Sequence, residues 1–336
     1  MPPRSEILEI MNAWRALAAS TETSGHQVID ILGVHHLRVK AGRLDGEEAL
    51  LFGFGGSPRT TTEVLPLGQG FTLSLTEELA APGEVWYTLR RRAAGDIDMF
   101  GNMAVDVLNA VLDFQGSDPT ARLRLFLNRV RAWQDFMRKG QHILLSSEEE
   151  VGLFGELITM RSLIDAGLTS SATAAAWRGP YDGLHDFVLG AGGLEVKTCA
   201  RQGRFIARIG DLEQLDDSMV RPLHLVAVRV AQADDGQSLP EKIQEVRDIL
   251  AGEFEATEAF ENGLLRLGYV DALASSYVRR YVSIDIRVYV VDGDFPRLFS
   301  ANVPSAVTRA SYDLDIDTIP TEQIDLIRAL ENCGAI

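Results

Sequence analysis

Residues 181–200, YDGLHDFVLGAGGLEVKTCA, place charged side chains inside a stretch that is otherwise largely apolar. Asp186, Glu195 and Lys197 stand among Phe, Val and Leu residues, and Gly190 to Gly193 separate the two halves of the stretch. With those four residues as the loop, the two halves are expected to form an antiparallel hairpin. In this register Phe187 faces Val196 and Asp186 faces Lys197.

Side chains alternate along a strand, so this hairpin has one charged face and one apolar face. The charged face carries Asp186, Val188, Glu195 and Lys197, and the apolar face carries Phe187, Leu189, Leu194 and Val196. A slip of one residue would turn the charges toward the core, which supports the alternation. The sequence thus predicts two carboxylates and an ammonium group on one side of a buried hairpin.

Two carboxylates beside a lysine have a chemical use. The carboxylates of Asp186 and Glu195 and the carbonyl of Val196 are hard oxygen ligands of the kind that Mg²⁺ prefers, with Mn²⁺ as a substitute. Such a metal stabilises charge that develops at phosphorus and lowers the pKa of a bound water, which Lys197 would orient or help deprotonate. The alternative is an amphipathic hairpin whose polar face is solvated and whose charges form weak surface ion pairs.

Composition limits the class of protein. A chain of 336 residues with 46% hydrophobic and 24% charged residues is typical of a soluble protein and long enough for two domains. Two cysteines form no disulfide framework, and the N-terminus, broken by Glu6 and Glu9, is unlike a signal peptide, so a cytoplasmic location without membrane contact is expected. The net charge of −16 argues against a large basic face, so a nucleic-acid partner would need a local basic groove on an acidic body.

The order of the expected elements predicts an α+β fold. A helix at about 5–19 precedes strand-like runs, among them EALLFGFG and VWYTLRRR, that are spaced as in an antiparallel sheet. We predict an N-terminal antiparallel β domain over 1–115 for recognition or assembly, a helical connector over 116–145, and a mixed-sheet domain with a C-terminal β extension over 146–336. In the last domain a helix that Ser147 caps and Gly167 ends is followed by strands at 185–189, 194–199, 203–209 and 222–231, and by a helix at 239–250.

The hairpin resembles the catalytic signature of the PD-(D/E)XK nuclease superfamily, the fold of many restriction enzymes and Holliday-junction resolvases. In this resemblance Asp186 is the strand acid, and the EVK tripeptide supplies Glu195 and Lys197. The superfamily core runs helix, three-stranded meander, helix and strand, which fits the expected order. His185 stands where the nominal motif has proline.

Many members of the superfamily also carry a glutamate on the first helix that faces the metal. GLFGEL at 152–157 places Glu156 there, with a solvated helix surface as the alternative. Gly152 and Gly155 each cost a helix interior up to about 1 kcal/mol, so close packing of this helix on a sheet is the expected compensation.

A wider resemblance covers most of the chain and is weakest over the first 100 residues. It is carried by WRGPYDGLHDF, LEVKTC, YVVDGDFPRLFSANVP and the helical run that begins at RLRLFLNRV. These segments are similar to one bacterial family of PD-(D/E)XK proteins found in restriction–modification-like defence operons. The resemblance implies DNA as substrate and, as partners, a helicase-like ATPase, a MutL-type ATPase and a DNA methyltransferase.

Further residues near the motif are candidates for binding DNA. Arg201, Arg204 and Arg208 would hold the phosphate backbone, and Gln214 would lie over the site as glutamines do in some relatives; surface charge balance and a helix-surface role are the alternatives. Trp177 and Tyr181 would stack on a base or be buried aromatics.

Two hypotheses about function follow. In the first, the chain is a Mg²⁺-dependent DNA endonuclease that serves as the cleavage subunit of a restriction-like system. In the second, it is a catalytically inert nuclease-fold module that binds DNA or partner subunits. The complete set of Asp186, Glu195 and Lys197 favours the first, because inert relatives usually lose one of the three.

Overall fold

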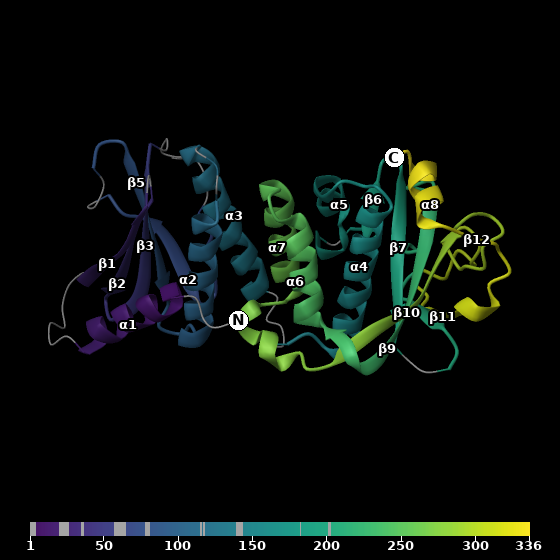
Figure 1. The fold of residues 1–336 in the computed structure, drawn as a ribbon, viewed down its shortest axis with the longest axis horizontal. Coiled ribbons are helices and arrows are strands. Elements are labelled where there is room, and N and C mark those ends of the chain that lie inside the picture. The colour runs from purple at the N-terminus through teal and green to yellow at the C-terminus, as the bar shows by residue number, and fades with distance from the viewer. Residues whose placement is uncertain are drawn as a thin grey trace. The chain divides into compact units, whose positions relative to one another are not determined.

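The chain folds into two compact units, residues 1–141 and 142–336, each with its own sheet (Figure 1). The structure is a computed structural model. It describes residues 5–19, 27–34, 37–56, 65–77, 81–114, 116, 118–138, 144–181, 183–200 and 203–336. The first unit combines an antiparallel sheet with helices, and the second combines a mixed sheet with helices, so the α+β prediction is confirmed.

The sheet of the first unit is antiparallel, with described strands in the order β1, β2, β3, β5, β4. Their bounds are Gln27–Val34 (β1), Leu37–Leu44 (β2), Glu47–Gly55 (β3), Phe71–Leu75 (β4) and Glu84–Arg91 (β5). The sequence does not reveal β1, because Asp30 and Gly33 break its apolar pattern and the ladder to β2 is irregular after Asp30. The other four strands follow the predicted runs.

Three helices belong to the first unit: α1 (Ser5–Ala19), α2 (Ile97–Leu112) and α3 (Pro119–Arg138). The ring of Phe126 on α3 lies 4.8 Å from the ring of Phe52 and 5.3 Å from the ring of Phe54, both on β3. Most of the segment 116–145, which was expected to be a connector, is therefore part of the core of the first unit. The packing of Phe126 against β3 stabilises helix α3.

The sheet of the second unit has the strand order β12, β10, β9, β7, β6 among the described residues. The bounds are Phe187–Leu189 (β6), Gly192–Cys199 (β7), Leu223–Ser238 (β9), Arg280–Val290 (β10) and Gln323–Ile324 (β12). β7 and β9 are parallel, and the other neighbours are antiparallel.

The expected three-stranded meander is wrong at its third strand. β8 (Ile206–Ile209) follows β7 in the chain but pairs with β11 (Tyr312–Asp315) in a separate two-stranded sheet. Phe205, Ala207 and Ile209 are buried in one core cluster with residues of β9, so β8 lies over a face of the main sheet and leaves the place beside β7 to β9.

Both faces of the main sheet are buried. Leu194 and Val196 of β7 join the core cluster formed with helix α4 (Ser147–Asp165), whereas Cys199 joins the cluster formed with β8. By alternation, Glu195 and Lys197 point to the side of Cys199. The polar face of the hairpin is thus covered in part by a second layer.

Helix α4 begins one residue earlier than predicted. Ser146, not Ser147, is the N-cap, and it forms a capping box with Glu149; Ala166 is the C-cap and Gly167 follows it with φ of 108°. A Cβ on Gly155 would lie 1.8 Å from Thr198 Oγ1 of β7, so close packing explains this glycine. The same explanation is wrong for Gly152, where a Cβ would meet nothing within 4 Å.

The remaining helices of the second unit are α5 (Ser170–Ala176), α6 (Leu239–Leu250), α7 (Phe254–Leu267) and α8 (Leu326–Cys333). α6 has the predicted bounds, because Ser238 and Glu241 form a capping box at its start. Sequence patterns did not predict α5, α7 or α8. Across the part of the chain that is described, no helix has the length and apolarity needed to cross a membrane.

Candidate metal and nuclease site

The hairpin that carries the predicted site is formed by β6 and β7, with a shorter loop than expected. The pairs are Phe187 with Leu194, Val188 with Gly193 and Leu189 with Gly192. The expected register is therefore wrong by two residues, and the turn consists of Gly190, at φ of 57°, and Ala191. Gly192 belongs to β7 and is glycine because a Cβ there would lie 2.4 Å from Cys333 Sγ.

A shift of two residues leaves the faces of the hairpin unchanged, because side chains alternate with a period of two. The predicted apolar face is confirmed: Phe187, Leu189, Leu194 and Val196 are all buried. On the other face Glu195 is buried and Lys197 is partly buried, while Val188 is exposed. Glu195 and Lys197 therefore lie on the same face of β7 as predicted, although the predicted register is wrong.

Asp186 lies directly before β6 and is tied to both neighbouring segments. Its Oδ2 accepts the Val196 N–H at 2.7 Å, and its main-chain carbonyl accepts the N–H groups of Arg178 and Gly179. The N–H and carbonyl of one residue in an extended strand point to the same side. The Val196 carbonyl therefore faces the same edge as the Asp186 carboxylate.

Glu195 and Lys197 form an ion pair on β7. Lys197 Nζ lies 2.8 Å from Glu195 Oε1, and the Glu195 side chain is only 4% exposed. Because the two residues are separated by one position, they project on the same face of the strand. Asp211, in the turn after β8, adds negative charge that acts on Glu195.

Glu156, the candidate on α4, approaches Asp186. Its Oε2 accepts a hydrogen bond of 2.7 Å from Trp177 Nε1. A Cβ on Gly179 would lie 3.1 Å from both Glu156 Oε2 and Asp186 Oδ1. Gly179 therefore leaves room between two carboxylates that come from different elements, and the Glu156 side chain is partly buried.

Desolvation raises the pKa of all three carboxyl groups. Desolvation, reinforced by the negative charge of Asp186, raises the pKa of Glu195 to about 8 despite the opposing Lys197. The same two causes hold the pKa of Glu156 well above its usual value. Desolvation also raises the pKa of Asp186, against the Val196 N–H and Lys197. Three acids and one lysine leave an excess of negative charge that protons or a cation would neutralise.

The donor set fits a hard divalent cation in its chemistry. Three carboxylates and a main-chain carbonyl are oxygen ligands, and the excess charge favours a cation. Within the described residues, however, no group of three or more His, Cys, Asp or Glu side chains is already arranged to hold a metal ion. Glu195 is engaged with Lys197, so metal binding would require this carboxylate to reorient.

The predicted DNA-binding residues have different surroundings. Arg201 lies outside the described residues. Arg204 precedes β8, is exposed and lies 3.4 Å from Asp315. Arg208 is exposed on β8, opposite Asp313 of β11. Gln214 accepts the Gly210 N–H at 2.9 Å and thereby closes a turn.

The loop after α5 contributes residues that sequence patterns did not single out for these roles. Trp177 is buried, so it is not a surface for base stacking, and it contacts Glu156 instead. Gly179 lies next to the carboxylates, and the exposed side chain of Arg178 precedes it. The WRGPYDG run of this loop was a signal, since Trp, Arg and Gly occur together seven to nine residues before Asp186.

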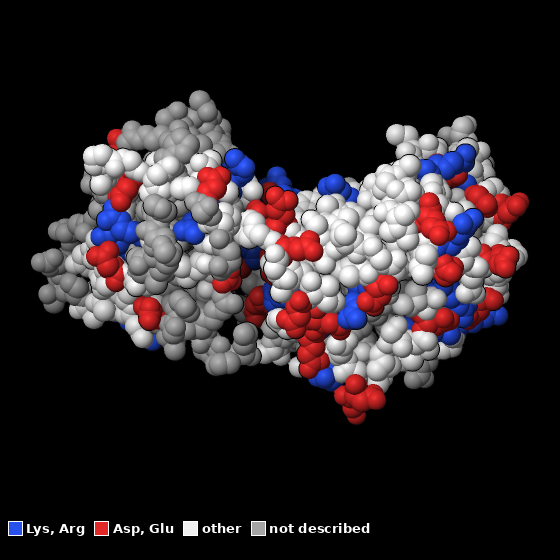
Figure 2. All heavy atoms as spheres, turned by 45° about the horizontal axis from the view of Figure 1, so that its top comes forward, with Lys and Arg blue, Asp and Glu red and all other residues white. Residues whose placement is uncertain are grey.

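Most arginines of the second unit are paired with acids. Arg287 bonds Asp285 and Asp317, and Arg297 bonds Asp217. On the face shown in Figure 2, Lys and Arg side chains are interspersed with Asp and Glu and form no broad basic field. A nucleic acid would therefore meet a few local cations on an acidic body, as the net charge implies.

Comparison with known proteins places the chain in context. A family model described as "Putative PD-(D/E)XK family member" matches residues 10–317, which is most of the chain. Nucleases of the PD-(D/E)XK type generally use divalent metals. No curated protein and no solved structure shows a significant match.

Proposed function

The chain belongs to this PD-(D/E)XK family, and from that premise we propose that it is a metal-dependent DNA endonuclease that hydrolyses phosphodiester bonds. The observation that carries the proposal is the convergence of Asp186, Glu195, Glu156 and Lys197. These side chains come from a loop, from β7 and from α4, which are distant in sequence. Such a set has a use in phosphoryl transfer and no evident use in stabilising the fold.

The acids bear an electrostatic cost that a purely structural role would not explain. Replacing buried carboxyl groups by apolar residues of similar size is often neutral or stabilising, so their presence favours a function. Asp186, Glu195 and the Val196 carbonyl would hold Mg²⁺, or Mn²⁺ in its place, with Glu156 behind them. A metal bound there would supply Lewis-acid stabilisation of charge at phosphorus. Lys197 would orient a water or take part in its deprotonation.

Cations near the site would hold the DNA backbone. Arg178 immediately precedes Gly179, is exposed and has no ion pair among the described residues. This supports Arg178 as a phosphate contact, in addition to Arg201, Arg204 and Arg208. Gln214 would contribute through the turn that it closes beside β8.

A nuclease with so acidic a body would depend on partners to reach DNA. We propose that it is the cleavage subunit of a restriction-like defence system in the cytoplasm, with a helicase-like ATPase, a MutL-type ATPase and a DNA methyltransferase. The first unit would serve recognition or assembly. Its deletion should lower the affinity for DNA or a partner, measured by pull-down and gel shift, and leave Mn²⁺ binding by the second unit intact.

Cleavage of plasmid DNA tests the proposal. Wild-type protein is incubated with supercoiled plasmid and Mg²⁺ or Mn²⁺, with and without the neighbouring operon products. Asp186→Asn should abolish cleavage, whereas Asp165→Asn, on the exposed end of α4, should cleave like wild type. DNA binding without metal-dependent cleavage under all these conditions would overturn the endonuclease and support the inert module.

A further inference from the structure

Trp177 is a buried aromatic residue whose one polar atom points at the candidate site. It is the only tryptophan of residues 142–336, and its side chain is almost completely buried. Its indole Nε1 donates a hydrogen bond of 2.7 Å to Glu156 Oε2. An indole nitrogen is a donor only, so it bonds the carboxylate of Glu156 in preference to a protonated oxygen.

The indole ring is fixed by its surroundings. A Cβ on Gly263 of α7 would lie 2.7 Å from the ring, so the helix backbone is packed directly against it. The ring of Phe260 lies 5.6 Å away, and the main chain of Trp177 bridges to Phe187 of β6. The ring is thus packed on α7, and the main chain of the same residue is linked to the hairpin.

The carboxylate that this N–H holds is the one that reaches the site from α4. Glu156 Oε2 and Asp186 Oδ1 both lie 3.1 Å from the position of a Cβ on Gly179. Without the indole donor, Glu156 would face Asp186 with no other hydrogen bond among the described residues to fix its rotamer, and repulsion between the two carboxylates would turn it away. A fixed donor offsets that repulsion.

We propose that Trp177 is a positioning residue that holds Glu156 toward Asp186 for binding of a divalent cation. This inference rests on the proposed function. Groups that orient metal-binding side chains typically change metal affinity or activity by about 10–100-fold when they are removed. Trp177 touches neither metal nor DNA in this assignment and acts through Glu156.

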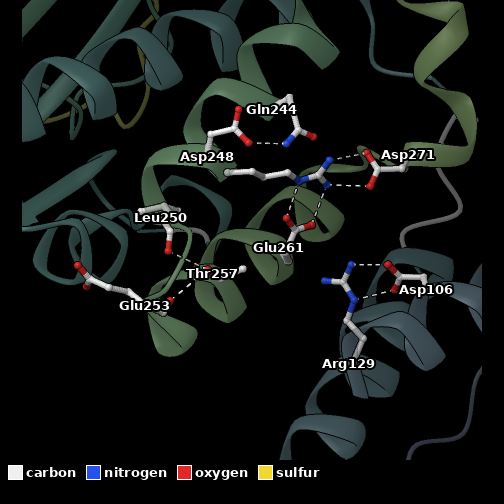
Figure 3. Close-up of polar contacts among 10 residues, drawn as sticks. Asp106, Arg129, Gln244, Asp248, Leu250, Glu253, Thr257, Glu261 and Asp271 are labelled. Atoms are coloured by element: carbon white, nitrogen blue, oxygen red, sulfur yellow. Dashed lines mark hydrogen bonds and ion pairs between the residues drawn. The ribbon is translucent and has the colours of Figure 1, made fainter. Parts of the chain in front are cut away.

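The test compares two tryptophans that make the same contact. Trp133 Nε1 donates to Asp106 Oδ2 at 2.6 Å in the first unit, where Arg129 also holds Asp106 (Figure 3). Trp177→Phe and Trp133→Phe each keep an aromatic ring and lose one N–H to a carboxylate. Mn²⁺ affinity of the full chain is measured by calorimetry. We expect Trp177→Phe to weaken it by about 10-fold, and Trp133→Phe to leave it unchanged.

Two further measurements separate positioning from general damage. In a Glu156→Gln background, Trp177→Phe should cause no additional loss of Mn²⁺ affinity, because the group it orients is already changed. Saturating Mn²⁺ should alter the emission of Trp177, obtained as the difference between wild type and Trp177→Phe. If Trp177→Phe does not fold, a benzothiophene analogue of tryptophan, with sulfur in place of the N–H, replaces it.

The outcomes distinguish this inference from the proposed function. Wild-type protein that binds no Mn²⁺ would overturn the proposed metal site, and the role of Trp177 with it. Wild-type protein that binds Mn²⁺ with an affinity that Trp177→Phe does not change would overturn the role of Trp177 alone. Equal losses in Trp177→Phe and Trp133→Phe would also overturn it, because they would reflect stability.

Discussion

Glu195→Gln should reveal the electrostatic cost of the site as a dependence of stability on pH. The ordinary pKa of a glutamate is 4.5, and that of Glu195 in the fold is about 8, because the side chain is buried beside Asp186. The folded state therefore keeps a proton that the unfolded state loses, and the free energy of unfolding falls as pH rises from about 4.5 to about 8. At about 1.4 kcal/mol for each pH unit, the loss amounts to at most about 5 kcal/mol.

Glutamine has the shape of protonated glutamate and does not ionise. In EDTA at pH 5, Glu195→Gln and wild type should unfold at similar urea concentrations. At pH 9 the variant should be the more stable, by up to about 5 kcal/mol, a value that already includes the opposing effect of Lys197. At pH 8, Mn²⁺ at 100 times its Kd should raise the free energy of unfolding of the wild type by about 2.7 kcal/mol. The same Mn²⁺ concentration should raise that of Glu195→Gln by less.

Glu241→Gln is a control of opposite sign. Its carboxylate accepts the Ser238 N–H in the capping box of α6, and this bond, with help from Arg280, lowers the pKa of Glu241. That contribution is present above pH 4.5 and is lost as pH falls, so Glu241→Gln should be less stable than wild type at pH 9. A difference between Glu195→Gln and wild type that stays the same from pH 5 to pH 9 would refute the reasoning.

Three other changes test separate parts of the structure. Lys197→Arg and Lys197→Ala should both abolish cleavage and leave DNA affinity unchanged in gel shifts, because a guanidinium neither gives up its proton nor fits like an ammonium group; full activity of Lys197→Arg would mean that charge alone suffices. Arg178→Ala should weaken DNA binding and lower the slope of log affinity against log salt by about one; an unchanged slope would exclude a phosphate contact. Gly155→Ala should destabilise the chain by about 2 kcal/mol through its collision with Thr198, while Gly152→Ala should stabilise it by about 1 kcal/mol in urea unfolding; equal effects would show that α4 does not pack on β7 as described.

The electrostatics also explain why the candidate site is fragile. Glu195 and Asp186 repel each other, and Lys197 and the Val196 N–H oppose this repulsion. Stability was evidently not optimised here, because neutral residues at these positions would avoid the cost. A site with more carboxylates than cationic groups favours the binding of a cation, which would neutralise the excess negative charge.

Sequence alone determined the features that depend on near neighbours. The alternation of Phe187, Leu189, Leu194 and Val196 fixed which face of the hairpin is core, and it did so although the predicted register was wrong by two residues. The sequence also predicted α6 from Leu239 to Leu250, the bounds that the structure has. Such patterns report local backbone geometry, which a few adjacent residues decide.

Only the tertiary structure decided which distant groups meet. Trp177 was one aromatic residue among several in the sequence, and its hydrogen bond to Glu156 arises because α4, α7 and the hairpin pack around the same loop. The sequence also did not predict that β8 pairs with β11 and not with β7. The alternating apolar residues Ala207 and Ile209 would be buried in either arrangement. Local periodicity encodes whether a strand forms, whereas its partner depends on which arrangement buries the most apolar surface across the whole unit.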